Sequence, residues 1–505
     1  MKKELLFVLV LLVVATALRF WQFHGYLEFL DDQGRDAIVA KQILVNHNLT
    51  LLGPGTSIGK MYLGPLYYYV MVPFLALTYP DPSGPAYMIA VLGIVTVVLI
   101  YTLGKRLVGR RAAAMAALLY AVAPSIVQLS RFSWQPNPAP FVGLLMMWLT
   151  YTALKGKTWH WFWVAVCFAV LIQLHYVALL SAIPSAIFFA YDYWKRRRQK
   201  LALRTYLAII VASIAMLVIS QLPLIVFDIL HHGLIREGFA EFFAAQQRHA
   251  PLLQHIWLIL ANSQGRGMYI TIEQFGLSNQ LRSLNGYLLD VFIVVVILQF
   301  LPRYLKHNPR ALQLKIVTAW VATALIGLSI YTDTVYVHYF AYVLPAVFLL
   351  LGASFSFISE RHVALKWGSY GVVAAAVMLN IITSPYWKPK VSDIERVKQV
   401  STDLEPFVSG TVRYNIALLN DNREYRGMKY RYFFETTQNP PQSQYDYNNL
   451  DKLIVITENG EDPLGSPIFE IQQFRNETKN PVVVTSREYQ SIVHAYVFER
   501  PTNAK

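Results

Sequence analysis

The sequence is poor in charged residues and almost without cysteine. Only 15% of its 505 residues are charged, whereas an average soluble domain carries about 25%. Cys167 is the single cysteine, which excludes an intramolecular disulfide and any metal site built mainly from thiolates. No internal repeat is visible, and the C-terminal part lacks both a glycine-rich phosphate loop and a metal-spaced cluster. The chain therefore has no disulfide framework and no visible motif for binding a nucleotide sugar.

Long apolar runs are what the chain has instead, and 55% of its residues are hydrophobic. A run of about 17–25 such residues is long enough to cross a bilayer, so the pattern predicts a multi-pass, all-α membrane protein. The runs lie at 4–20, 62–79, 86–103, 112–129, 139–154, 159–173, 177–194, 203–226, 286–301, 314–331, 339–358 and 365–382.

The net charge of +14 comes from short basic segments between these runs. They lie at 105–111, 195–200 and 303–315. Such clusters are typical of cytoplasmic loops, so nucleic acid is not an expected partner and membrane lipids are.

The run 62–79 decides the topology. If it crosses the membrane, the later basic loops fall outside; if it lies along the outer face, all of them fall inside. We predict the second arrangement, which the prolines Pro65 and Pro73 also favour. It gives about eleven spanning helices, an uncleaved first helix, an inner N-terminus and an outer C-terminus at the cell membrane.

Residues 386–505 are predicted to form a small α/β domain outside the membrane, after a membrane domain at 1–385. Ser392 is expected to cap a helix that ends near Leu404, with Glu395 completing a capping box. Strand-like runs follow at 412–419, 452–457, 481–485 and 491–498.

The densest group of charges follows the first apolar run. Asp31, Asp32, Arg35 and Asp36 fall within six residues, and ionisable groups close to a bilayer tend to mark function. The alternative is a solvated cap on an interfacial helix, with Asp31 or Asp32 at the N-cap.

Further polar residues stand at the expected outer ends of helices. Lys60 is expected either to bind a phosphate or to be an ordinary lysine at the membrane interface. Arg131 is expected either to bind a phosphate or to contact a lipid headgroup. Two His-Tyr pairs, at 175–176 and 338–339, also fall there, although a lone histidine is more often structural. We interpret His231, His232, Glu237 and Glu241 as loop surface.

Four segments resemble the GT-C membrane glycosyltransferases, in the branch of protein O-mannosyltransferases and lipid A aminoarabinose transferases. They are DDQGRDA, GPLYYY, SRFSWQPNP and HYFAYVLPA, and the resemblance covers roughly residues 1–385. The chain departs from the family pattern in three places. Gln33 stands where glutamate is usual, Leu63-Gly64 replaces a His-Pro, and Asn137 lies near a replaced aspartate.

The resemblance implies an inverting enzyme that moves a sugar from a polyprenyl-phosphate donor to an acceptor outside the cytoplasm. Asp32 is then the expected catalytic base, and Arg131, Lys60 and Arg35 are expected to hold the donor phosphate. The expected substrate contacts are Asp31, Asp36, Asn137, His338 and Tyr339. No organic cofactor is expected, a divalent metal stays open without assigned ligands, and the sugar and the acceptor stay undefined.

The sequence leaves two other functions open. A transporter or flippase for lipid-linked sugars also fits polar residues at helix ends, although many transporters show repeated halves. An inactive glycan-binding accessory protein fits the departures at Gln33 and Asn137.

Overall fold

The computed structural model describes residues 2–56, 59–197, 202–245, 311–329, 336–360, 362–478 and 480–501. The chain forms two compact units, and neither is a continuous stretch of sequence. The helical unit comprises Met1–Trp21, Thr50–Val70 and Ala86–Lys388. The α/β unit comprises Gln22–Leu49, Met71–Pro85 and Pro389–Lys505. The domain boundary expected near residue 386 takes no account of the two N-terminal segments that belong to the α/β unit. As a division of the linear sequence it stays a prediction.

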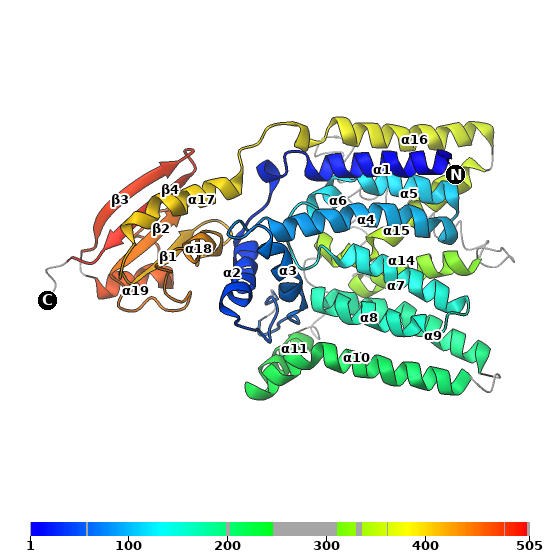
Figure 1. Ribbon diagram of the computed structural model, residues 1–505, viewed down its shortest axis with the longest axis horizontal. Coiled ribbons are helices and arrows are strands. Elements are labelled where there is room, and N and C mark those ends of the chain that lie inside the picture. Colours follow the sequence, from blue (N-terminus) through cyan, green and yellow to red (C-terminus); the bar gives the residue numbers. More distant parts are fainter. Residues whose placement is uncertain are drawn as a thin grey trace. The chain divides into compact units, whose positions relative to one another are not determined.

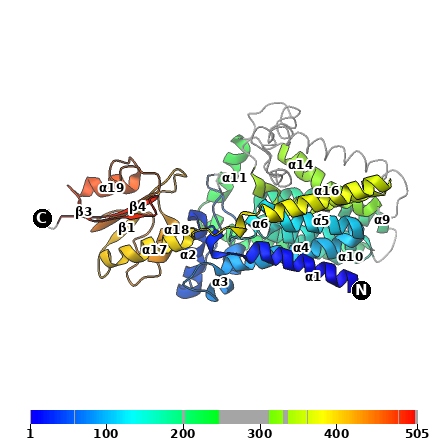
Figure 2. The same cartoon turned by 90° about the horizontal axis from the view of Figure 1, so that it is seen from above.

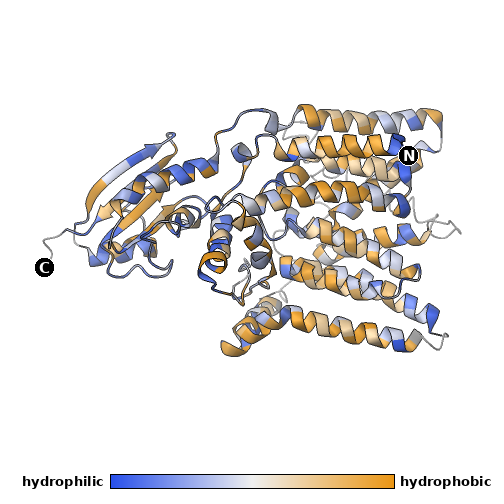
Figure 3. Ribbon diagram, viewed as in Figure 1, coloured by the Kyte–Doolittle hydropathy of each residue, from blue (hydrophilic) through white to orange (hydrophobic). Residues whose placement is uncertain are grey.

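The helical unit is a bundle of helices that run side by side (Figure 1), and most of their residues are coloured as hydrophobic in Figure 3. Its main helices are α1 (Lys2–Phe20), α4 (Gly84–Leu107), α5 (Arg110–Val122), α6 (Pro124–Leu129), α7 (Ala139–Leu154), α8 (His160–Leu174), α9 (Ala182–Arg196), α10 (Ala202–Leu230), α11 (Leu234–Ala245), α14 (Ala311–Ser329), α15 (Leu344–Ser359) and α16 (Val363–Ile382). The short 3-10 helices η2 (Tyr176–Ser181) and η4 (Val337–Val343) precede α9 and α15.

Six helices of the described part are long and apolar enough to cross a membrane on their own. Helices also form at the other expected apolar runs of the described part. The expected run 112–129 is divided into α5 and α6, with a break before Pro124. The predicted multi-pass membrane fold is thereby confirmed. The run 286–301 and the basic residues Arg303, Lys306 and Arg310 lie outside the described residues.

Described residues of two basic segments, 105–111 and 195–200, contact other helices of this bundle. Lys105, in the last turn of α4, pairs with Glu4 in the first turn of α1. The guanidinium of Arg106 lies 5.8 Å from the ring centre of Trp148 on α7. Arg196 of α9 donates to the carbonyl of Leu154 at 3.4 Å. The first helix therefore starts at the end where α4, α7 and α9 stop, as the charge pattern requires.

Helix α3 (Leu66–Ala76) is too short to span. Its eleven residues reach about 17 Å, roughly half the thickness of the hydrocarbon core. This length agrees with the expectation that 62–79 does not cross, while its position on the outer face stays a prediction.

The α/β unit contains a four-stranded sheet in the order β1-β2-β4-β3. The strands are β1 (Tyr414–Leu419), β2 (Lys452–Thr457), β3 (Val482–Tyr489) and β4 (Val493–Glu499). β1 and β2 are parallel, whereas β4 runs antiparallel to both β2 and β3. All four expected strands are present, which confirms the predicted α/β tail.

Helices cover both faces of this sheet, as Figure 2 shows, with α19 (Phe469–Glu477) on one side and α17 (Asp393–Leu404) and α18 (Met428–Phe434) on the other. Strand β1 is buried at every position, as expected for a strand between two layers. The core beneath α19 contains Ala417, Leu419, Leu453, Val455, Ile471, Phe474 and Phe498.

Ser392 caps α17 as expected, because its Oγ accepts the backbone N–H of Glu395 at 3.3 Å. The predicted capping box is wrong in its second half. Within the described residues the Glu395 carboxylate makes no bond to the Ser392 backbone, and it lies beside His24 and Asp81 instead. The N-cap of α17 therefore has the bond to the Ser392 side chain without the reciprocal bond from the Glu395 side chain.

Helix α2 (Asp31–Asn46) belongs to the α/β unit and packs on α18. A Cβ on Gly34 would lie 2.5 Å from the backbone nitrogen of Lys429, so only glycine permits this approach. The N-cap of α2 is Leu30 rather than Asp31 or Asp32. Gln33 Oε1 accepts the Leu30 N–H at 2.9 Å, which gives this residue a local structural role.

Candidate functional site

Arg35 organises the charged group at the start of α2. Its Nη1 lies 2.8 Å from Asp32 Oδ1, and its Nε and Nη2 hold Asp36 Oδ1 at 2.9 and 2.8 Å. The Asp36 side chain is only 1% exposed, whereas that of Asp32 is 43% exposed. One arginine thus connects a buried carboxylate to an accessible one.

Asp31 faces the opposite way, toward α18. It is buried, and its Oδ1 accepts the backbone N–H of Lys429 at 3.3 Å. Burial raises the pKa of Asp31 to about 6, with Lys429 opposing the shift and the carboxylates Glu424 and Glu458 adding to it. The Asp31 carboxylate therefore belongs to the contact between α2 and α18.

Three charged residues of the C-terminal part interact with the acidic start of α2 and were not predicted from the sequence. They are Glu424, Lys429 and Glu458. Lys429 Nζ pairs with Glu458 at 2.7 Å, and the Tyr430 hydroxyl donates to the same carboxylate at 2.7 Å. Burial raises the pKa of Glu424, and the nearby charge of Asp32 adds to the shift. The one available signal was a run of bases at 423, 426, 429 and 431.

Arg131 lies in the helical unit and is almost fully buried. Its Nη1 and Nη2 donate to the carbonyls of Leu18 and Trp21 at 2.8 and 2.9 Å. Its guanidinium stands 4.2 Å from the ring centre of Tyr386. The observed contacts therefore hold the C-terminal end of α1, where carbonyls lack intrahelical partners.

Lys60 is accessible and paired with acids of α11. Its Nζ lies 2.8 Å from Glu237 and 3.6 Å from Glu241, with 43% of the side chain exposed. The hydrogen bond with Glu237 raises the pKa of Lys60. The two glutamates, expected to be plain loop surface, thus form an ion-pair site, and a phosphate at Lys60 would compete with them.

His338 and Tyr339 of η4 belong to an aromatic cluster in the helical unit. The His338 ring centre lies 4.5 Å from that of Trp134 and 5.2 Å from that of His175. The His175 and Tyr339 ring centres are 4.9 Å apart. The pair at 338–339 is thereby brought together with His175 of the other pair and with Trp134.

Asn137 lines a small cavity of about 20 Å³, together with Gly93, Tyr120 and Ser130. Its Nδ2 donates to the Phe132 carbonyl at 3.0 Å. Its buried Oδ1 has no hydrogen-bond partner among the described residues, and the cavity is large enough for one water molecule.

Arg19 is a further buried cation that the sequence analysis missed. It is fully buried in the last turn of α1 and donates to the carbonyls of Ala15 and Ala121 at 3.3 and 3.0 Å. Within the described part of the chain, its Nε and Nη2 have no partner. An arginine at the end of an apolar run is the signal that would have identified it.

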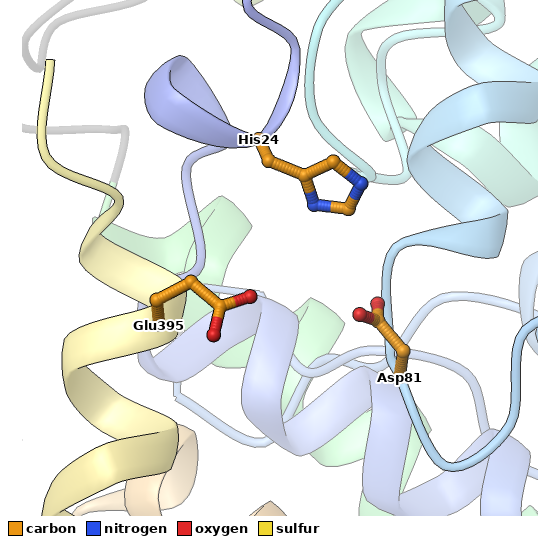
Figure 4. Close-up of side chains that lie close together, drawn as sticks. All are labelled: His24, Asp81 and Glu395. Carbon is orange, nitrogen blue, oxygen red and sulfur yellow. The ribbon is translucent and has the colours of Figure 1, made fainter.

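The expected site residues thus lie in two groups. Asp31, Asp32, Arg35 and Asp36 share the start of α2 in the α/β unit, whereas Lys60, Arg131, Asn137, His338 and Tyr339 lie in the helical unit. One cluster in the described residues has metal-ligating side chains from separate segments: His24, Asp81 and Glu395, which Figure 4 shows pointing toward one another.

Comparison with known proteins supports the fold. Residues 63–222 match the protein-family model described as dolichyl-phosphate-mannose-protein mannosyltransferase. No curated protein sequence matches the chain.

Solved structures match over nearly the whole length. ArnT from Cupriavidus metallidurans in the apo state has a TM-score of 0.60 at 13% identity, with 98% of each chain covered. The same protein bound to undecaprenyl phosphate has a TM-score of 0.57 at 13% identity, covering 99% of this chain and 98% of that one. The oligosaccharyltransferase of Archaeoglobus fulgidus, in complex with Zn and sulfate, has a TM-score of 0.53 at 12% identity. That match covers 98% of this chain and 74% of the oligosaccharyltransferase chain.

Proposed function

We propose that this chain, a multi-pass membrane protein with the fold of the GT-C glycosyltransferases, moves a sugar from a polyprenyl-phosphate donor to an acceptor hydroxyl. The observation that carries the proposal is the similarity in fold to ArnT along nearly the full length of both chains. The family match at 63–222 supports the same chemistry. The undecaprenyl phosphate of the ArnT structure supports a polyprenyl phosphate as the carrier.

In the proposed reaction the acceptor oxygen attacks the anomeric carbon and forms the new glycosidic bond. The bond between that carbon and the phosphate oxygen breaks, and polyprenyl phosphate leaves with the bonding electrons. The acceptor proton passes to Asp32, which acts as the general base. The anomeric configuration is inverted because a single displacement takes place.

The contacts of the three aspartates support Asp32 as this base. Asp31 is buried against α18, and Asp36 is buried beneath Arg35. Asp32 alone among them is substantially exposed, and Arg35 orients it through one hydrogen bond. An acceptor hydroxyl can reach this carboxylate without opening the contact between α2 and α18.

Three cations remain candidates for the donor phosphate. Lys60 and Arg35 are accessible, with 43% and 29% of their side chains exposed. Arg131 is buried and already donates to two carbonyls. Exposure therefore favours Lys60 as the first contact of the phosphate, with Arg131 supporting the end of α1. Asn137, His338 and Tyr339 are proposed to contact the donor from the helical unit.

The test uses the purified full chain in detergent or proteoliposomes with synthetic polyprenyl-phosphate sugars. A transferase releases polyprenyl phosphate, by transfer to added acceptors or by slow hydrolysis. Movement of intact donor between leaflets without release would assign a flippase. Saturable donor binding with no release would assign the accessory protein. The extracytoplasmic location of the site is part of this proposal and is tested by adding acceptor to one side of sealed vesicles.

A further inference from the structure

Three potential metal ligands meet in the α/β unit, one from each of the three segments that compose it. His24 comes from Gln22–Leu49, Asp81 from Met71–Pro85 and Glu395 from Pro389–Lys505. Their ligand atoms all lie within 4.8 Å of one another. Figure 4 shows the imidazole and both carboxylates directed into a common space.

The backbones beneath these side chains are held by contacts of their own. Ser392 Oγ donates to the carbonyl of His24 at 2.8 Å, and this joins the first segment to the start of α17. Asp81 Oδ1 accepts the Ser83 N–H at 2.8 Å, while the Thr78 hydroxyl donates to the Asp81 carbonyl at 2.7 Å. One oxygen of Asp81 is thus used within its turn, and the other remains for a ligand.

The cluster combines one imidazole with two carboxylates. Among the described residues neither Asp81 nor Glu395 forms an ion pair with a lysine or arginine. The two basic residues near Glu395 in the sequence, Lys390 and Arg396, pair with Asp393 instead, at 3.0 and 2.9 Å. Two carboxylates that approach each other repel unless a cation lies between them. Glu395 moreover forgoes the capping bond that its position in α17 offers.

We propose that His24, Asp81 and Glu395 bind one divalent transition-metal ion, for which Zn²⁺ is the best-suited candidate. One imidazole nitrogen and two carboxylate oxygens form a donor set typical of Zn²⁺, whereas Mg²⁺ prefers oxygen ligands alone. Metal–ligand bonds of about 2.0–2.2 Å place tetrahedral ligands about 3.3 Å apart, so the three side chains close inward on binding. A water molecule completes the fourth position.

The ion joins three segments that are distant in sequence. His24 lies between the first helix and the segment that carries Asp32, so a metal here fixes the start of that segment to α17 and to the turn at Asp81. The role is structural, and it is independent of the reaction proposed above. Binding should stabilise the fold because the ion favours the folded state, in which the three ligands are together.

The experiment measures zinc binding and thermal stability of the full chain in detergent after treatment with a chelator. Zn²⁺ alone is added, the bound metal is counted by mass spectrometry after gel filtration, and unfolding is followed by tryptophan fluorescence. We expect about one ion per chain and a rise in Tm of several degrees. His24→Gln, Asp81→Asn and Glu395→Gln should each weaken binding at least tenfold and abolish the rise.

Matched controls use the same exchanges elsewhere in the α/β unit: His494→Gln, Asp421→Asn and Glu488→Gln. These variants should bind and respond like the wild type. Equal zinc binding by the triple variant at 24, 81 and 395 would overturn the proposal, as would no stoichiometric binding by the wild type at micromolar Zn²⁺. An equal rise in Tm with Mg²⁺ would overturn the assignment to a transition metal.

Discussion

The backbone N–H of Lys429 donates to Asp31 Oδ1 at 3.3 Å, across 398 residues of sequence. This bond joins the first turn of α2 to the first turn of α18 and therefore links the acidic segment to the C-terminal part of the chain. Asp32, the next residue, faces Arg35 and is accessible. Two adjacent carboxylates thus have different environments, and the variants below separate their roles.

Asp32→Asn should lower sugar transfer by about 100- to 10,000-fold, because it keeps the shape of the side chain but removes proton acceptance. Asp31→Asn and Asp36→Asn should be milder, since both carboxylates are buried in structural contacts. Turnover of the three variants at matched expression makes the comparison. The assignment is wrong if Asp32→Asn keeps more than about a tenth of wild-type turnover.

Asp31 should make stability depend on pH. Its folded-state pKa of about 6 lies above the value of about 3.9 in an unfolded chain. The folded state thus favours the protonated form, and its stabilising contribution is present below about pH 4 and lost as pH rises through 6. The loss is up to about 3 kcal/mol for a shift of this size.

Comparing the Tm of the wild type with that of Asp31→Asn isolates this contribution, because all other groups titrate in both proteins. Asn keeps an acceptor for the Lys429 N–H. The wild type should lose stability relative to the variant between pH 4 and 7. A constant difference across this range would contradict the burial of an ionisable carboxyl at this position.

Gly34→Ala should loosen the contact between α2 and α18. The added Cβ would lie 2.5 Å from the Lys429 nitrogen and from the Met428 carbonyl, so the two backbones must separate. Overpacking of this kind costs about 1–3 kcal/mol, and Tm should fall. Gly368→Ala is the control, because a Cβ there meets nothing within 4 Å. Equal Tm values for both variants would argue against the close packing.

Lys60→Gln should raise the KM for the lipid-phosphate donor with little change in kcat, if Lys60 holds the phosphate in the ground state. Glu237→Gln removes the nearer competing carboxylate and should lower that KM. Donor titrations with both variants test the pair. A lower KM in Lys60→Gln would remove this lysine from the phosphate site.

Cysteine labelling should place Lys195 and Tyr445 on opposite sides of the membrane. In a Cys167→Ala background, Tyr445→Cys is expected to react with an impermeant reagent in intact cells and Lys195→Cys only after permeabilisation, in agreement with the positive-inside rule. Both side chains are exposed, so burial does not limit the reaction. Labelling of Lys195→Cys in intact cells would reverse the topology.

Local sequence patterns were sufficient to predict the apolar helices and the four strands. Runs such as 203–226 are uniformly apolar and must satisfy their own backbone hydrogen bonds in lipid, which leaves the helix as the available form. The eleven-residue length of α3 and the cap at Ser392 also depend on neighbouring residues, and both agree with the sequence-based expectation. Local patterns predict local structure because the interactions that produce it span only a few residues.

Contacts between residues far apart in the sequence became visible only in the folded structure. The sequence assigned Glu395 to a capping box, but its carboxylate lies beside His24 and Asp81. The basic residues around 429 did not indicate that Lys429 would contact Asp31, and nothing in the sequence predicted that Glu237 would pair with Lys60. Each contact depends on the packing of whole elements, such as α2 on α18 at Gly34. No short stretch of sequence encodes such packing, because the free energy that selects it comes from many side chains buried together.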